Sequence, residues 1–173
     1  YDNPVSYINE RTGMQRNRSV RFNGVAEFKP TDNLTFKASY VRKGQTSMTG
    51  YYYSHNDVTT TESGYNGNAS RSASEYVYNL LETTANYQQD FGNHHVTGVL
   101  GYSYEDQASE NFSMSNRNFP TDMYLYNNIG KGQGLTEGTA TEYSYKQSSK
   151  LIGVFARATY NYDDRYLLMV SYR

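Results

Sequence analysis

The sequence has no cysteine, no tryptophan and only 3 prolines among its 173 residues. Without cysteine, the chain has neither a disulfide framework nor a thiolate metal site. Its 16 basic and 17 acidic residues give a formal net charge of -1, which offers no electrostatic reason to expect nucleic acid as a partner. No segment has the ~18 consecutive apolar residues of a membrane-spanning helix. The first residues lack the charged-then-apolar layout of an export signal, so an exported protein would need a segment upstream.

The residues that are abundant favour β-structure. The chain has 20 tyrosines and 14 glycines, and its mean hydropathy is only -0.85. Tyrosine suits strands, and its apolar ring with a polar hydroxyl also suits a membrane–water interface. A low mean hydropathy is compatible with a transmembrane barrel, because such a barrel needs an apolar residue only at every second position.

Apolar residues do recur at every second position. From Val20 to Phe28 and again from Leu34 to Tyr40, apolar and small residues occupy the even positions, and mostly polar ones occupy the odd positions. A period of two is typical of strands with one apolar and one polar face. The same pattern predicts three hairpins, over residues 20–40, 77–104 and 151–173, with turns at Pro30–Asn33, Asp90–His94 and Asp163–Arg165.

The connections between the hairpins have no sustained period. Lys43–Glu75 and Glu105–Ser148 are polar, and we interpret them as long loops. Loops of this length are uncommon in compact soluble domains, whereas outer-membrane barrels combine short periplasmic turns with long extracellular loops. Each predicted strand has about 9–12 residues, close to the ~9–11 that a tilted strand needs to cross the hydrocarbon layer.

The predicted fold class is therefore all-β: an antiparallel transmembrane β-barrel segment of about six strands in three hairpins. Six strands are fewer than the eight or so of the smallest single-chain barrels, and an open sheet would leave unpaired edges in lipid. We expect residues 1–173 to be part of a larger outer-membrane barrel. The segment has no plug domain, signal peptide or C-terminal barrel strand of its own.

The strand sequences also resemble a known family. Lys150–Arg173 reads KLIGVFARATYNYDDRYLLMVSYR, which is similar to a strand–turn–strand of SusC/RagA-type TonB-dependent transporters. Two further pieces resemble a mid-barrel hairpin and an extracellular loop of that family: YNLLETTANYQQDFGNHHVTGVLGYSYE and Asn118–Asp122.

The resemblance implies a location and a set of partners. It implies nutrient uptake across the cell outer membrane, with an oligosaccharide or peptide as cargo and no enzymatic activity or cofactor. The implied partners are a SusD-type surface lipoprotein, outer-membrane lipid, and TonB, which would act through an N-terminal region absent from this sequence. The sequence itself contains no convincing catalytic or metal motif.

Two sets of residues are candidates for ligand contact. The first set comprises polar residues that would face the barrel lumen: Arg21, Glu27, Lys37, Glu82, Gln88 and Arg157. They would touch the plug or a passing solute, or simply be solvated. The second set comprises loop aromatics that would contact the ligand or the lid protein: Tyr51, Tyr52, Tyr53, Tyr124 and Tyr126. These rings would otherwise pack the loops onto their neighbours.

Two other interpretations remain open from the residues alone. A soluble β-domain could bind carbohydrate or protein through its tyrosine-rich loops, but it would need a second layer to bury the apolar strand faces. A passive porin would share the barrel and differ in having no plug and no TonB-interacting segment. The apolar face separates the first alternative from a membrane barrel.

Overall fold

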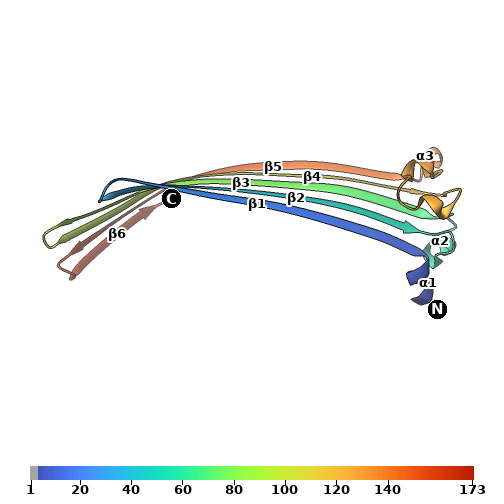
Figure 1. Ribbon diagram of the computed structural model, residues 1–173, viewed down its shortest axis with the longest axis horizontal. Coiled ribbons are helices and arrows are strands. Elements are labelled where there is room, and N and C mark those ends of the chain that lie inside the picture. The colour runs from blue at the N-terminus through green and yellow to red at the C-terminus, as the bar shows by residue number, and fades with distance from the viewer. Residues whose placement is uncertain (1–3) are drawn as a thin grey trace. The chain divides into compact units, whose positions relative to one another are not determined.

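The computed structural model describes residues 4–173, and their strands form one six-stranded sheet in the order β1-β2-β3-β4-β5-β6 (Figure 1). Each strand thus lies beside its neighbour in sequence, as three successive hairpins require. The strands are β1 (Arg11–Thr31), β2 (Leu34–Tyr53), β3 (Asn68–Phe91), β4 (His94–Arg117), β5 (Thr141–Tyr162) and β6 (Tyr166–Tyr172).

The helices are short. They are α1 (Pro4–Asn9), α2 (Val58–Glu62) and α3 (Gly134–Glu137), with two 3-10 turns at η1 (Asp122–Tyr124) and η2 (Ile129–Lys131). None of the helices within residues 4–173 has the length and apolar character needed to cross a membrane.

Five of the strands are longer than predicted, and this corrects the extent of the two predicted loops. The interpretation of Lys43–Glu75 and Glu105–Ser148 as loops is wrong at their ends, because strands occupy much of both ranges and the connections are only residues 54–67 and 118–140. Backbone pairing needs no apolar face, and Tyr and Thr favour extended structure whether or not apolar residues alternate with them. Hydroxyl and amide side chains also bond across these strands, as Ser47 does to Asn17 at 2.7 Å and Ser115 to Thr141 at 2.6 Å.

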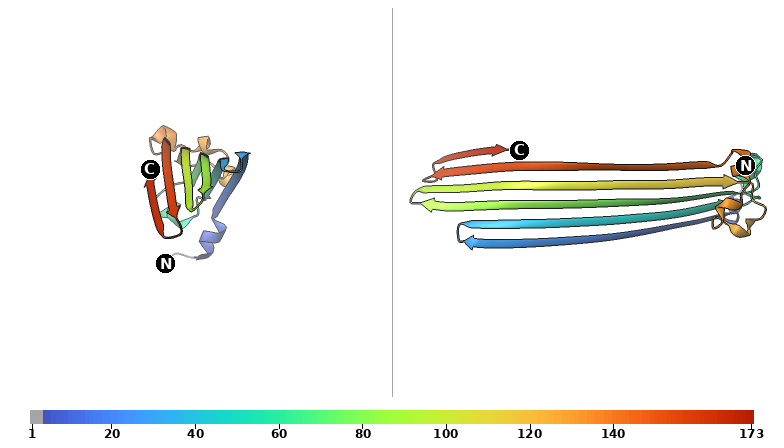
Figure 2. Two further views of the ribbon diagram at one scale, coloured as in Figure 1. Left: turned by 90° about the vertical axis from the view of Figure 1, so that its left-hand side faces the viewer. Right: turned by 90° about the horizontal axis from the view of Figure 1, so that it is seen from above.

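The chain divides into two compact units. One of them, unit 2, comprises residues 20–44, 77–108 and 148–173. It contains all three hairpin turns, which lie at one end of this unit (Figure 2). Gly92 takes a φ of 60°, and Asp163 and Asp164 take φ values of 50° and 53°. Glycine and aspartate tolerate this left-handed conformation in tight turns, which explains the turn signals in the sequence.

Strand register in unit 2 fixes which side chains share a face. Ala156 pairs with Tyr172, and Tyr160 pairs with Leu168. Directly paired residues lie on the same side of a sheet, so the even-numbered residues of 156–162 and 166–172 form one apolar face. Phe155 consequently lies on the opposite, polar face. A Cβ placed on Gly101 would collide with the Phe155 ring, so the ring occupies the space that this glycine leaves open.

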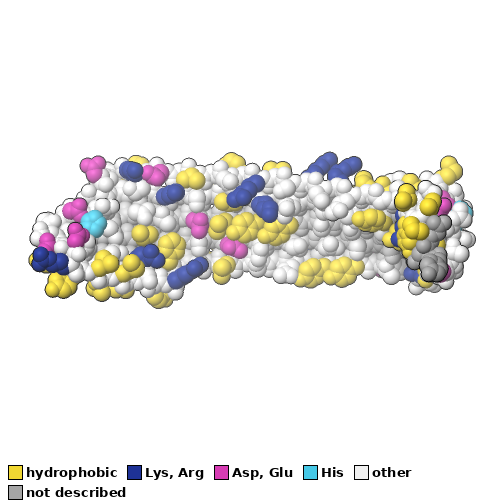
Figure 3. Space-filling view, turned by 90° about the horizontal axis from the view of Figure 1, so that it is seen from below, with side chains coloured by type: hydrophobic (Ala, Val, Ile, Leu, Met, Phe, Trp, Pro, Cys, Tyr) yellow, Lys and Arg dark blue, Asp and Glu magenta, His cyan; other side chains and the backbone are white. Residues whose placement is uncertain are grey.

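The apolar face of unit 2 is exposed. Val20 is 73% exposed and Leu168 is 62% exposed. The buried apolar residues within the described range are Tyr52, Ala69 and Phe119, none of which belongs to unit 2. The described residues therefore supply no second layer for this face. On the face of the sheet seen in Figure 3, basic and acidic side chains lie scattered among polar and apolar ones.

The described residues of unit 1 are 4–19, 45–76 and 109–147. They include α1, α2 and α3, which lie at the strand ends of this unit (Figure 1). Its small core consists of Tyr52, Ala69 and Phe119, and the Tyr52 and Phe119 rings meet edge to face at 5.7 Å. Leu125 and Ile129 of the second connection pack against this core. The second connection is thus folded onto the ends of the strands.

Candidate functional site

A polar hollow in unit 2 brings two of the candidate lumen-facing residues together. Glu82 of β3 and Arg157 of β5 both line it, and Phe155, Ser171 and Arg173 contribute to the same wall. The hollow measures about 660 Å³. It offers one carboxylate and two guanidinium groups, which suits a solute with polar or charged groups.

The other four candidate lumen-facing residues lie outside this hollow. Arg21 donates from Nε to the Asn23 side chain at 3.2 Å, and Glu27 forms an ion pair with Lys29 at 3.0 Å. Lys37 is exposed, and Gln88 donates its backbone N–H to the carbonyl of Asn33 at 2.9 Å. Exposed side-chain pairs such as Arg21–Asn23 and Glu27–Lys29 contribute little to the stability of the fold. A role for any of the six in contacting cargo or a plug stays a prediction.

The three consecutive tyrosines 51–53 were predicted to lie in a loop, but they form the end of strand β2, and their environments differ. Tyr51 is 44% exposed and its ring lies over Gly13. Tyr52 is 1% exposed and donates its hydroxyl to Asp122 at 2.6 Å. The Tyr53 ring lies under the Arg11 guanidinium, whose carbon is 4.6 Å from the ring centre. Tyr52 and Tyr53 therefore hold the loop, and Tyr51 presents ring surface to the outside.

The two tyrosines of the second loop differ in the same way. Tyr126 packs against the small core and lies over Gly50, where a Cβ would come within 2.6 Å of its ring. Tyr124 is 36% exposed. Among the five candidate tyrosines, Tyr51 and Tyr124 are thus the most exposed. Contact with a ligand or a lid protein stays a prediction for all five.

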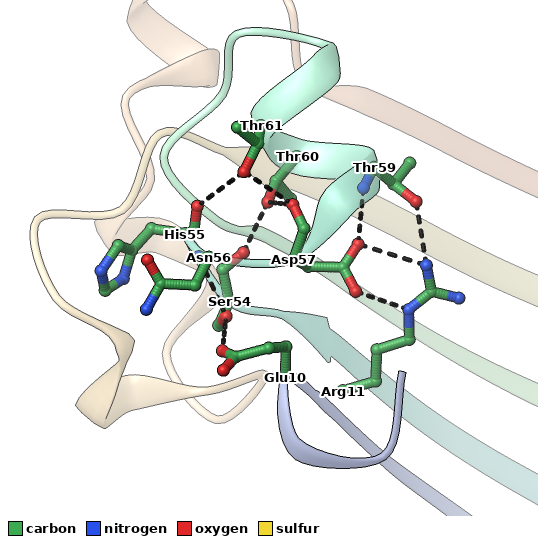
Figure 4. Close-up of polar contacts among 9 residues, drawn as sticks. All are labelled: Glu10, Arg11, Ser54, His55, Asn56, Asp57, Thr59, Thr60 and Thr61. Carbon is green, nitrogen blue, oxygen red and sulfur yellow. Dashed lines mark hydrogen bonds and ion pairs between the residues drawn. The ribbon is translucent and has the colours of Figure 1, made fainter. Parts of the chain in front are cut away.

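A polar cluster anchors the first loop to the start of β1 (Figure 4). Arg11 donates from Nε to Asp57 Oδ2 at 2.6 Å and from Nη2 to Asp57 Oδ1 at 3.2 Å, while its Nη2 also reaches Thr59 Oγ1 at 2.9 Å. The Asp57 side chain is 1% exposed. Asp57 also caps α2 by accepting the backbone N–H of Thr59 at 2.9 Å, which fits the preference for aspartate at helix N-caps.

The electrostatics of this cluster favour the charged forms of both partners. Burial raises the pKa of the Asp57 carboxyl, but the hydrogen bonds from Arg11 and Thr59 together with the Arg11 charge outweigh it. The pKa of Asp57 therefore lies below its ordinary value of 3.8. The hydrogen bond to Asp57 raises the pKa of Arg11, and burial opposes this only in part.

The lowered pKa of Asp57 predicts how the first loop responds to acid. A carboxyl whose pKa is depressed by folding stabilises the folded form above its ordinary pKa of 3.8, and this contribution disappears as the pH falls through the depressed value. We expect the protection of α2 amides in hydrogen exchange, corrected for intrinsic rates, to stay constant from about pH 7 to pH 5 and to decrease below about pH 4. An Asp57→Asn variant, which cannot ionise, should lose this acid-dependent step.

A second polar link joins the two loops of unit 1. Asp122 of η1 accepts the Tyr52 hydroxyl and the backbone N–H of His55, and it pairs with the His55 ring. Burial raises the pKa of the Tyr52 hydroxyl above its ordinary range, and the hydrogen bond to Asp122 adds to this effect. The phenol therefore stays protonated and keeps donating to Asp122.

Sequence reasoning missed the residues that build these links. The signal for Asp57 was present, because an aspartate before the run Val58–Glu62 is a helix N-cap pattern. No local signal marks its partner Arg11, which is 46 residues away in the chain. Within the described part of the chain, no group of three or more His, Cys, Asp or Glu side chains is placed to hold a metal ion.

Comparison with known proteins shows which proteins this chain is similar to. No family model matches the sequence. The chain is 25% identical over 172 residues to a curated protein named TonB-dependent receptor P3 from Formosa agariphila, a match that covers 99% of this chain and 17% of that protein. This match to a TonB-dependent receptor confirms the resemblance seen in the sequence.

Solved structures show the same fold. The chain matches the RagAB peptide transporter with a TM-score of 0.83 at 18% identity, over 95% of this chain and 18% of that one. It also matches the RagAB peptide importer in its "closed-closed" and "open-open" states, with TM-scores of 0.81 and 0.77 at 18% identity, over 94% and 95% of this chain and 18% of each of those chains. The predicted all-β antiparallel barrel segment is confirmed as the fold class. The chain spans less than a fifth of the length of the proteins it matches.

Proposed function

We propose that this chain forms part of the barrel wall of an outer-membrane, TonB-dependent importer of bulky nutrients such as oligosaccharides or peptides. It makes no covalent change to its cargo. Its polar sheet face contributes to the lumen, and its two loops contribute to the extracellular surface beneath a SusD-type lipoprotein lid. TonB drives the transporter through a region that lies outside this sequence.

The exposed apolar face of unit 2 is the observation that carries this proposal. Val20, Leu100 and Leu168 are each more than half exposed, and no described residue covers them. A soluble domain would lose a large part of its hydrophobic stabilisation with such a face in water, whereas a membrane barrel places that face in lipid. The likeness to a TonB-dependent receptor and to the RagAB transporter supports the same assignment.

Single cysteines give a direct test, because this chain has no cysteine of its own. In a cysteine-free version of the full-length protein in intact cells, we expect a membrane-impermeant maleimide to label Met123→Cys, since Met123 is 87% exposed in the second loop. Asn93→Cys in a hairpin turn should react only after the outer membrane is opened. Leu168→Cys should stay unlabelled until the protein is denatured.

The alternatives predict other labelling patterns. A soluble β-domain would recover in the soluble fraction, with Leu168→Cys as reactive as Met123→Cys. A passive porin would give the same labelling pattern as an importer. A measurement of cargo uptake is therefore needed to distinguish the two. We expect uptake of a fluorescent oligosaccharide or peptide cargo to stop in cells that lack TonB, whereas passage through a porin would continue.

A further inference from the structure

The apolar face of unit 2 contains a groove of distinctive composition. Three alanines from neighbouring strands, Ala26, Ala38 and Ala85, lie in it beside the larger Phe28, Phe36 and Leu100. The hollow measures about 450 Å³, and Phe28 and Leu100 are 65% and 58% exposed. Small side chains between large ones leave a channel that Glu27 and Lys37 also line but whose walls are mostly apolar, which matches a hydrocarbon chain.

A basic cluster lies further along the same strand faces. Tyr40 donates its hydroxyl to Asn79 Oδ1 at 3.0 Å, and Arg42 donates from Nη1 to the same oxygen at 3.1 Å. Arg42 follows Ala38 by four residues on β2, so it shares a face with Ala38 and lies roughly 13 Å farther along the strand. The groove and this cluster, Tyr40–Arg42–Asn79, therefore occupy one continuous face within one unit.

The positive charge of Arg42 in this cluster indicates which kind of lipid head group it can bind. Arg42 is exposed, and among residues 4–173 its bonding partner is the neutral Asn79 side chain. Asn79 accepts one of the five N–H donors of Arg42, so the other donors are available to a partner outside the described residues. A guanidinium with such free donors binds phosphate in a two-pronged geometry that a neutral or zwitterionic head group satisfies less well.

We propose that this face holds a phosphorylated glycolipid of the outer leaflet, with one acyl chain in the alanine groove and a phosphate at Arg42. The inference rests on the proposed membrane location. It names the outer leaflet because the cluster lies on the part of unit 2 away from its hairpin turns, which we assign to the periplasmic side. Aromatic hydroxyls beside a basic side chain are typical of the boundary between hydrocarbon and head groups.

The test is the lipid that the full-length protein retains after extraction from outer membranes in mild detergent, measured by native mass spectrometry. Wild-type protein should retain a phosphorylated glycolipid. Arg42→Gln should reduce the retained amount about five- to tenfold, the effect of one basic side chain facing an anionic lipid head group. Ala38→Phe, which fills the groove and leaves the charge in place, should reduce it by a similar factor.

Lys43→Gln is the matched control, because it removes one positive charge from the adjacent residue on the other face of β2. It should leave retention unchanged. Heat-modifiable migration on gels checks that each variant is folded, and if Ala38→Phe fails to fold, Arg42→Gln alone decides. Equal retention in Arg42→Gln and wild type, or retention of a zwitterionic phospholipid instead, would overturn the lipid site alone. Recovery of the wild-type protein outside the membrane would overturn both this site and the proposed function.

Discussion

Replacing Asp57 by alanine is expected to release the first loop, residues 54–67, while the strands stay paired. The substitution leaves the Arg11 guanidinium without its carboxylate and removes the N-cap of α2. Breaking a buried ion pair by removing one partner costs roughly 3–5 kcal/mol, and we expect about 2–3 kcal/mol here because the Arg11 side chain is 27% exposed. Hydrogen exchange of the α2 amides in the full-length protein should accelerate about 30-fold or more.

Glu62→Gln is the matched control for this variant. Glu62 is the exposed carboxylate at the other end of α2, so neutralising it removes a charge of the same sign from the same helix without breaking the anchor. Exchange in the control should stay within about twofold of wild type, the range of ordinary surface substitutions. If Asp57→Ala and Glu62→Gln behave alike, the Arg11–Asp57 pair does not hold the loop.

Replacing Asn116 by aspartate should loosen the second loop, residues 118–140, by a comparable amount. Asn116 is 1% exposed, and its Nδ2 donates to the carbonyls of Ile129 and Gly132 at 2.8 and 2.9 Å. Aspartate has nearly the same shape but no donor, and its ionised oxygen would face two carbonyl oxygens. Leaving these buried groups unsatisfied costs about 3 kcal/mol or more, so exchange in the loop should rise about 100-fold.

The exposed Asn127 of the same loop provides the control, since Asn127→Asp adds the same charge where water solvates it. In the Asn127→Asp variant, the amides of the second loop should exchange at close to wild-type rates. Limited proteolysis should cut within residues 118–140 only in the Asn116→Asp variant. Equal protection in both variants would show that the Asn116 hydrogen bonds are not what orders this loop.

The two anchors act on different loops, so their effects can be separated. Asp57 and Arg11 hold residues 54–67, whereas Asn116 holds residues 118–140, and contacts such as His55–Asp122 and Asn66–Phe119 join the two loops. We expect Asp57→Ala to change exchange mainly in the first loop and Asn116→Asp mainly in the second. If cargo uptake falls in only one of the two variants, that variant identifies the loop on which cargo binding depends.

The amino-acid sequence by itself determined the strand faces and the turns. Alternation with period two depends only on backbone geometry, so it placed the even-numbered residues of 152–160 and 166–172 on one face, as the register of β5 and β6 confirms. The turn at Asp163–Arg165 was equally local, because the backbone conformation there favours a few residue types. The family resemblance was carried by these same strand segments.

Tertiary structure alone decided where the strands end and which of the adjacent tyrosines is buried. The ends of β2 and β4 have no sustained apolar alternation, and backbone pairing with neighbouring strands extends them without it. Tyr51 and Tyr52 are adjacent and chemically identical, yet Phe119 and Asp122, about 70 residues away, bury only Tyr52. Contacts between residues so far apart arise only when the chain has folded, since local sequence carries no record of its partner.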